Sequence, residues 1–365
     1  MRRPDIPVLT TLRFPAAFAI VLYHFLVYTP CPAWIWDGFS AGVSFFYVLS
    51  GFILYYNYFD LKDRGFFWFA RFARIWPVHI ATLIMAFLVM PFDRLLGHAS
   101  WQITLPANIL LVHAWLPLKG SVLSFNGVSW SLSVEAFFYL CFPWLLSGLN
   151  RRGPLFLLAA SFGIGFVVIL LATIYWPNNA VYVSTFNPVC RVFEFVLGMA
   201  TCRFWLEGRE ARVTVLGNWL GREILAVIIS LALVVALPAA IMESKIANPT
   251  TAWLGLETCA LGFAALIWVF AHEAGPISRA LSRRYLTWLG EISFAVYMCH
   301  QIILRRLIPD QPKFTDTTRV LETFALVLVL TLLVAAAIFH LVETPARHAL
   351  VAAYKRWAKR PARDA

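Results

Sequence analysis

The sequence predicts an all-α membrane protein, a polytopic bundle of about ten transmembrane helices with cytoplasmic N- and C-termini. The first observation is composition: 61% of the 365 residues are hydrophobic and only 13% are charged, whereas a soluble domain carries about 25% charged residues. The second is a series of apolar stretches of about twenty residues, the length that one bilayer crossing requires. The third is an uneven distribution of Lys and Arg along the chain.

Ten apolar stretches are candidates for these helices. They lie near 12–30, 40–58, 76–95, 128–148, 155–176, 188–207, 222–242, 252–272, 286–308 and 320–344. The run ITLPANILLVHAWLPL at 103–118 is short and interrupted by proline, so we expect it to lie at the interface or to re-enter the membrane. Because no internal repeat or low-complexity linker divides the chain, we expect a single domain over 1–365, with a core of about 12–347 and a short basic tail, 348–365.

The positive charges predict the orientation of the bundle. With the N-terminus inside, 22 of the 30 Lys and Arg residues lie on the cytoplasmic side, 7 lie on the outer side, and Arg191 falls within a span. Cytoplasmic loops are enriched in positive charge, and an even number of spans places both termini there. The net charge of +11 is then explained by orientation and lipid headgroups, so we expect the bilayer and not nucleic acid as a partner.

The six cysteines predict neither a metal site nor a redox motif. They form no C-x-x-C pair and mostly fall within apolar runs. We therefore interpret them as small core residues and expect no metal.

Two ionisable residues interrupt the first apolar stretch, LRFPAAFAIVLYHF. Arg13 and His24 are eleven residues apart, which is about three helical turns, so both side chains face the same way about 16 Å apart. Ionisable groups within a membrane span are costly and are candidates for function. A single buried histidine is also commonly a core residue bonded to the backbone, so the interpretation depends on its partners.

A pair of arginines follows in RGFFWFARFARIWP. Arg71 and Arg74 are three residues apart and share a helical face, and Pro77 suits the first turn of the next span. One interpretation is a positive-inside anchor that binds lipid phosphates. The other is an anion site for a phosphorylated cytoplasmic ligand, because guanidinium groups hold phosphate bidentately and Arg13 enters the membrane from the same side.

A carboxylate interrupts the span NGVSWSLSVEAFFYLCFP. Glu135 should face the bundle interior and pair with His24 or with an arginine, and Ser131 lies on the same face four residues earlier. A structural ion pair and a catalytic role are both open. A base, an anion clamp and a carboxylate together suit transfer of a group from a phosphorylated donor to a hydroxyl.

The remaining polar residues lie in three segments. GEISFAVYMCHQII holds Ser293 and His300, which we regard as supporting candidates together with Ser131. In HLVETPAR, Glu343 and Arg347 are spaced for an i,i+4 salt bridge that would fix the last helix. Asn108 and His113, in 103–118, could line an acceptor entrance or bond broken backbone.

These motifs together resemble the acyltransferase-3 family of membrane enzymes, over about Leu12 to Arg347. The resemblance includes RFPAAFAIVLYH, RFARIWP, WSLSVEAFFY, GEISFAVYMCH and VETPAR, and GVSFFYVLSGFIL carries Ser44 where an aspartate is common. The resemblance implies ten core helices in a bacterial cytoplasmic (inner) membrane. It also implies acetyl-CoA or another acyl-CoA as cytoplasmic donor, and a carbohydrate or lipid-linked carbohydrate acceptor reached from the other side.

By that resemblance His24 is the catalytic histidine and Glu135 an essential acid, while Arg13, Arg71 and Arg74 bind the phosphates of the donor. The expected reaction is O-acetylation of an exopolysaccharide, a lipopolysaccharide O-antigen or a lipo-oligosaccharide. A small natural product such as a macrolide is the alternative acceptor. A transporter or flippase of lipid-linked sugars and a structural membrane subunit are the rivals from other classes. The sequence does not set the oligomeric state.

Overall fold

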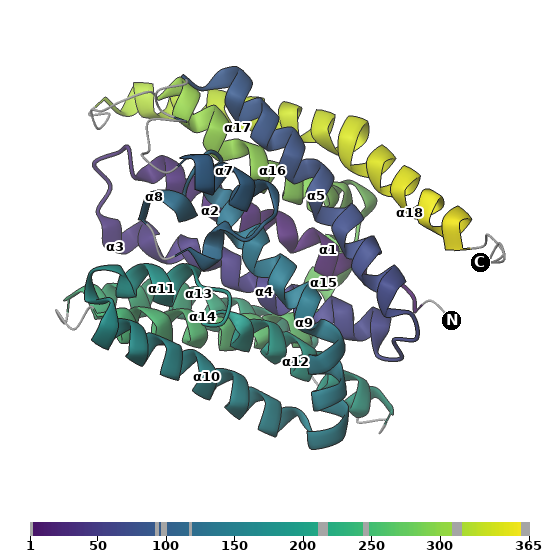
Figure 1. Ribbon diagram of the computed structural model, residues 1–365. Helices are drawn as coiled ribbons and strands as arrows, with labels where there is room; N and C mark the ends of the chain where they lie inside the picture. The colour runs from purple at the N-terminus through teal and green to yellow at the C-terminus, as the bar shows by residue number, and fades with distance from the viewer. Residues whose placement is uncertain are drawn as a thin grey trace.

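The computed structural model describes residues 3–91, 95, 101–116, 119–210, 218–243, 248–308 and 316–358, and these residues form only helices and loops. Ten long helices form the bundle (Figure 1). They are α2 (Arg13–Leu26), α4 (Gly42–Tyr58), α5 (Arg64–Val89), α9 (Trp130–Arg152), α10 (Pro154–Tyr175), α12 (Val192–Glu210), α13 (Trp219–Glu243), α14 (Pro249–Phe270), α16 (Arg284–Leu307) and α17 (Thr317–Ile338).

Shorter helices precede or connect these ten, and α18, of 15 residues, follows the last of them. They are α1 (Pro7–Thr11), α3 (Ala33–Trp36), η1 (Asp37–Ala41), α7 (Trp101–Ile109), η2 (His113–Trp115), α8 (Lys119–Val122), η3 (Gly127–Ser129), η4 (Pro177–Asn179), α11 (Ala180–Phe186), α15 (Pro276–Leu281), the π-helix η5 (Phe339–Glu343) and α18 (Thr344–Ala358).

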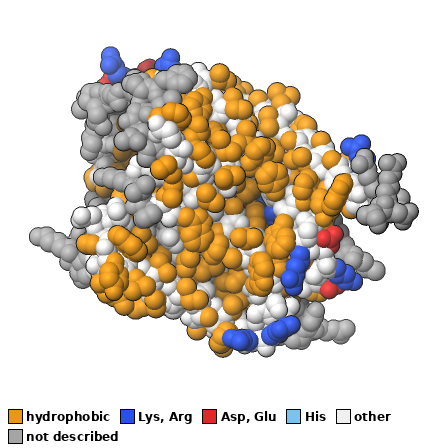
Figure 2. Space-filling model, viewed as in Figure 1, with side chains coloured by type: hydrophobic (Ala, Val, Ile, Leu, Met, Phe, Trp, Pro, Cys, Tyr) orange, Lys and Arg blue, Asp and Glu red, His pale blue; other side chains and the backbone are white. Residues whose placement is uncertain are grey.

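Each predicted span overlaps one of the ten long helices, which confirms the helical membrane bundle. Eight helical segments of the described chain are long and apolar enough to cross a bilayer; α12 and α16, at the predicted spans 188–207 and 286–308, are not among them. Figure 2 shows the matching surface, with a broad hydrophobic face and Lys and Arg gathered towards its edges. The described part of the chain begins and ends on the same side of the bundle in Figure 1.

Helix α5 begins earlier than the sequence pattern predicted. The side chain of Asp63 accepts a hydrogen bond from the backbone N–H of Phe66 (2.8 Å), so this N-cap starts the helix at Arg64 and not near 76. Pro77 consequently lies inside α5 and not in its first turn, which corrects the prediction. The early start carries Arg71 and Arg74 on the same rigid helix as the membrane span.

The centre of the bundle is a close contact between α4 and α12. A Cβ atom at Gly51 would lie 2.0 Å from the carbonyl oxygen of Phe195, and one at Gly198 would lie 1.9 Å from that of Val48. Small residues allow helix backbones to approach in membranes, where van der Waals packing replaces the hydrophobic effect. One face of α4 is thereby fixed against α12, and its other face is available to the site described below.

Helix α17 continues into α18 through a π-helical turn, η5. The ring of Tyr354 on α18 contacts Phe66 and Phe69 on α5, with centroid distances of 5.7 and 4.9 Å. Helix α18 therefore packs along the first part of α5 where a short tail was predicted, and the end of that tail, 359–365, lies outside the described residues.

The segment 103–118 contains α7 and η2, and its last two residues lie outside the described part. Asn108 and His113 are fully buried, which disfavours an acceptor entrance. Nε2 of His79 lies 2.9 Å from the carbonyl oxygen of Asn108, at the end of α7. Leu111 follows with a φ of 57°, a conformation that does not continue an α-helix. Burial also lowers the pKa of His113 to about 3, so this side chain is neutral and suits packing against the broken backbone.

Candidate active site

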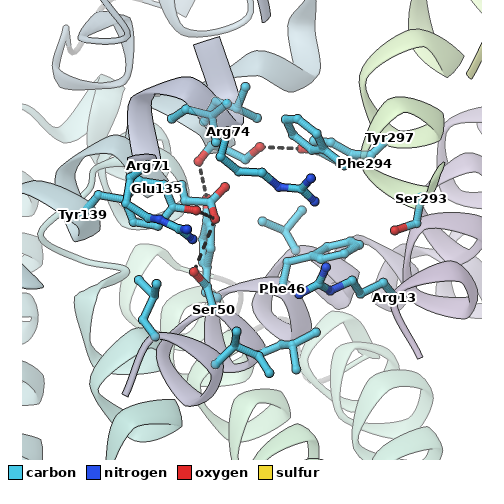
Figure 3. Close-up of a pocket in the computed structure, with 18 residues that line it drawn as sticks. Arg13, Phe46, Ser50, Arg71, Arg74, Glu135, Tyr139, Ser293, Phe294 and Tyr297 are labelled. Carbon is cyan, nitrogen blue, oxygen red and sulfur yellow. Dashed lines mark hydrogen bonds between the residues drawn. The ribbon is translucent and has the colours of Figure 1, made fainter. Parts of the chain in front are cut away.

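Five helices enclose a cavity of about 120 Å³ within the bundle (Figure 3). Its polar lining is one carboxylate, three guanidinium groups, hydroxyl groups and aromatic rings. The residues are Arg13 on α2, Ser50 on α4, Arg71 and Arg74 on α5, Ser131, Glu135 and Tyr139 on α9, and Ser293, Phe294 and Tyr297 on α16. The structure thus brings together six of the eight candidates predicted from the sequence, and His24 and His300 lie elsewhere on the same helices.

The three arginines reach the cavity from two directions. In Figure 3, Arg71 and Arg74 extend from one side and Arg13 from the opposite side. Nη2 of Arg71 lies 3.4 Å from the hydroxyl oxygen of Tyr58, and its guanidinium lies over the Tyr58 and Tyr139 rings at 5.5 and 5.8 Å. These contacts hold Arg71 at the cavity without neutralising its charge.

Arg74 is paired with Glu343 of η5, whereas Arg13 has no partner among the described residues. The guanidinium of Arg74 donates to Oε1 of Glu343, whereas Arg13 has no hydrogen bond or ion pair with any residue that the structure describes. A guanidinium inside a membrane bundle is costly unless a negative charge compensates it. Arg13 therefore marks the place where an anionic ligand would fit.

The pairing of Glu343 corrects the sequence prediction. Within the described chain no ion pair joins Glu343 to Arg347. The π-helical turn Phe339–Glu343 changes the spacing that an uninterrupted α-helix would give, and the carboxylate meets Arg74 instead. A one-turn π-helix is not visible in a pattern of apolar residues, so this pair could not be predicted from the sequence.

Glu135 is the only carboxylate among the residues that line the cavity. It accepts hydrogen bonds from the hydroxyl of Tyr139, four residues later on α9, and from Oγ of Ser50 (3.3 Å). The sequence predicted His24 or an arginine as the partner of Glu135. In the structure its described hydrogen bonds are to hydroxyl groups, and the arginines line the same cavity. The i,i+4 spacing of Tyr139 was a signal that the sequence interpretation missed.

The described hydrogen bonds of Ser131 and Ser293 are to Tyr297 and to backbone carbonyl groups. Oγ of Ser131 lies 2.8 Å from the hydroxyl oxygen of Tyr297 and also donates to the Val128 carbonyl (3.0 Å). Ser293 donates to the carbonyl oxygen of Gly290 in its own helix (2.7 Å). Ser131 therefore fixes Tyr297 at the cavity wall, while Ser293 is a lining residue whose proton is already engaged.

His24 and His300 form a pair on the two helices that continue beyond the cavity. Nδ1 of His24 lies 3.1 Å from Nε2 of His300 and 3.0 Å from the carbonyl oxygen of Ile20. His300 is fully buried and His24 is half-buried. Helix α16 links the two places, because Tyr297 faces the cavity three residues before His300.

Comparisons with known proteins identify the family of this chain. A family model described as an acyltransferase domain matches residues 6–340. Acyltransferase MdmB of Streptomyces mycarofaciens is 31% identical over 73% of this chain and 68% of that protein. Exopolysaccharide production protein ExoZ of Rhizobium meliloti is 28% identical over 72% of this chain and 75% of its own length.

A further relative is longer than this chain. Peptidoglycan O-acetyltransferase OatA of Listeria monocytogenes is 25% identical over 94% of this chain, which spans only 56% of OatA. No solved structure matches this chain.

Proposed function

This chain belongs to the acyltransferase-3 family, and we propose that it moves an acetyl group from cytoplasmic acetyl-CoA to a hydroxyl of a cell-surface or exported carbohydrate. Membership of the family makes it a multi-pass membrane acyltransferase. We propose acetyl-CoA as the donor and a carbohydrate as the acceptor. We also propose that the protein lies in the bacterial inner membrane with both termini in the cytoplasm. The name of ExoZ supports an exopolysaccharide as the acceptor, and the name of OatA supports O-acetylation of a glycan outside the membrane. A lipopolysaccharide O-antigen is a further acceptor that we propose.

The observation that carries the proposal is the excess of guanidinium groups in the cavity. Arg13, Arg71 and Arg74 line the same cavity as Glu135. Within the described part of the chain, only Arg74 of these three forms an ion pair, with Glu343. Phosphate is the anion that guanidinium groups hold best, and coenzyme A carries phosphates. The cavity of about 120 Å³ is smaller than typical ligand sites of roughly 300–1,000 Å³, so we expect it to hold only part of the donor.

The separation of Arg13 and His24 suits the shape of such a donor. Eleven residues of helix place the two side chains about 16 Å apart along the axis. The pantetheine arm of coenzyme A is a spacer between its phosphates and its sulfur. We expect phosphate groups at the arginines and the thioester near His24, with the arm along α16 past Phe294 and Tyr297.

In the reaction that we propose, His24 acts as general base. It takes the proton of an acceptor hydroxyl, the hydroxyl oxygen forms a bond to the thioester carbonyl carbon, and the carbon–sulfur bond breaks. The proton then passes from His24 to the thiolate of coenzyme A, so charge and atoms balance. His24 as nucleophile, with an acetyl-histidine intermediate, is the second route. A burst of free coenzyme A in the absence of acceptor would identify that route.

Transfer of labelled acetyl groups in inside-out membrane vesicles tests the proposed function. We expect wild-type protein to move label from acetyl-CoA to a surface-glycan extract, and His24→Ala to lower the rate by about 10²- to 10⁴-fold, the usual contribution of a general base. His348→Ala, an exposed histidine on α18, is the matched control and should retain the wild-type rate at equal protein level.

Three other results would change the assignment. Label in a small organic-soluble product would favour the natural-product acceptor. Movement of a lipid-linked sugar across the vesicle membrane without consumption of acetyl-CoA would favour a transporter. Equal transfer by His24→Ala would remove His24 from the reaction.

A further inference from the structure

His24 and His300 contact each other and also contact backbone carbonyl groups through their ring nitrogens. Nδ1 of His300 lies 2.6 Å from the carbonyl oxygen of Tyr297, and its Nε2 lies 3.1 Å from Nδ1 of His24. The same Nδ1 of His24 lies 3.0 Å from the carbonyl oxygen of Ile20. A short chain of contacts therefore runs from the backbone of α16 through two imidazole rings to the backbone of α2.

The carbonyl groups at both ends decide where the protons are. A carbonyl oxygen only accepts hydrogen bonds, so Nδ1 of His300 must carry a proton and donate it to Tyr297. In the neutral ring Nε2 of His300 is then an acceptor. Nδ1 of His24 faces two acceptors, the Ile20 carbonyl and Nε2 of His300, and so it must also carry a proton. Nε2 of His24 is left with a free lone pair.

We propose that His300 is a positioning residue that holds His24 in the Nδ1–H tautomer and keeps its Nε2 unprotonated for the transferred group. This inference rests on the proposed acyl transfer, and it applies to both routes because a base and a nucleophile each need that lone pair. His300 takes the place that a carboxylate occupies behind the histidine of a Ser-His-Asp triad. The sequence predicted His24 or an arginine as the partner of Glu135, and did not single out His300 as the partner of His24.

The contacts of His24 hold its ring through the proton transfer. The Tyr23 ring lies edge-on to the His24 ring, with 4.9 Å between the ring centroids. When His24 takes a proton from the acceptor, Nδ1 remains a donor, so the bond to His300 persists and stabilises the imidazolium. The ring need not turn during the reaction, which is the property of a preorganised site.

Kinetics of two substitutions at His300 test the inference. His300→Phe keeps a ring but removes the acceptor, and we expect kcat to fall by about 10- to 100-fold, the range for losing a partner that orients a functional histidine. KM for acetyl-CoA should stay within about twofold, because Arg13, Arg71 and Arg74 are unchanged. His300→Gln offers an amide oxygen to Nδ1 of His24 and should recover most of the rate. Equal losses in both variants, or a change in KM alone, would overturn the positioning role.

The tautomer itself can be measured without turnover. ¹⁵N NMR of histidine-labelled protein in bilayers, with His24→Ala to identify the signal, should show protonated Nδ1 and unprotonated Nε2 in wild type and a smaller fraction of that form in His300→Phe. His24 in the Nε2–H form would overturn the inference whatever the activity. The expected tautomer in a protein that transfers no acetyl group would instead overturn the proposed function, and with it the catalytic part of this inference.

Discussion

Two groups of ionisable side chains lie inside the bundle on either side of α4. They differ in their exposure and in their numbers of guanidinium and carboxyl groups. In the first group, Nη2 of Arg191 lies 3.0 Å from Oγ of Ser44 and 3.0 Å from Oε1 of Glu194. Arg191 is 1% exposed and the other two side chains are 0% exposed. Glu257, also buried, adds a second carboxyl group near Arg191, so carboxyl groups outnumber guanidinium groups here.

The cavity group has the opposite imbalance. Three guanidinium groups meet two carboxylates, one of which is Glu343 at its edge, and Arg13 has no bonded partner among the described residues. The comparison teaches that an ionisable residue in a membrane helix does not by itself indicate a ligand site. An enclosed group acts as a structural connection between helices. An excess of cations around an open volume indicates a place for an anion.

The largest effect should come from breaking the enclosed group. Arg191→Leu leaves Glu194 buried without its cation, and removal of one partner of a buried pair costs about 3–5 kcal/mol. We expect a large loss of folded protein, measured as melting temperature and yield in detergent. Arg13→Leu is the matched variant in the cavity and should melt close to wild type. Similar melting of the two variants would contradict the distinction between the groups.

Neighbouring residues on α4 sharpen the same comparison. Gly51 faces α12, and because its Cβ would lie 2.0 Å from the Phe195 carbonyl oxygen, Gly51→Ala should lower the free energy of unfolding by about 1–3 kcal/mol. Ser50 faces the cavity, and Ser50→Ala removes its bond to Glu135 (3.3 Å). We expect Ser50→Ala to cost about 1 kcal/mol or less. Denaturation of both variants in the same detergent would test this order, and a reversed order would contradict it.

A smaller effect should follow from releasing Arg74. Glu343→Gln keeps the shape of the side chain but removes the charge that neutralises Arg74, so Arg74 becomes more available to an anion. We expect KM for acetyl-CoA to fall by a few fold, because an unpaired guanidinium binds a phosphate better than a paired one. Titration of initial rates against acetyl-CoA would measure this effect. A raised KM would show that the ion pair, and not the free guanidinium, holds the donor.

The parts of the site that one helix fixes could be predicted from the sequence. The separation of Arg13 and His24 follows from helical periodicity, and so does the shared face of Arg71 and Arg74. The start of α5 was also readable in principle, because Asp63 precedes Phe66 by the spacing of an N-cap.

The partners of these residues could not be predicted, because tertiary packing selects them. His24 and His300 are 276 residues apart, and Arg74 and Glu343 are 269 apart. Each pair depends on which helices become neighbours and on the local turn at η5. Periodicity describes the face of one helix and contains no information on the residue that meets it.

The measurement that tests the central claim most directly is a steady-state comparison of Arg13→Ala and His24→Asn with labelled acetyl-CoA and glycan acceptor. Loss of a hydrogen-bonded charge costs about 1.5–3 kcal/mol, so we predict that Arg13→Ala raises KM for acetyl-CoA by roughly 10- to 100-fold and leaves kcat nearly unchanged. We predict that His24→Asn lowers kcat and leaves KM unchanged. The account would be contradicted if Arg13→Ala changed kcat alone, or if His24→Asn changed KM alone.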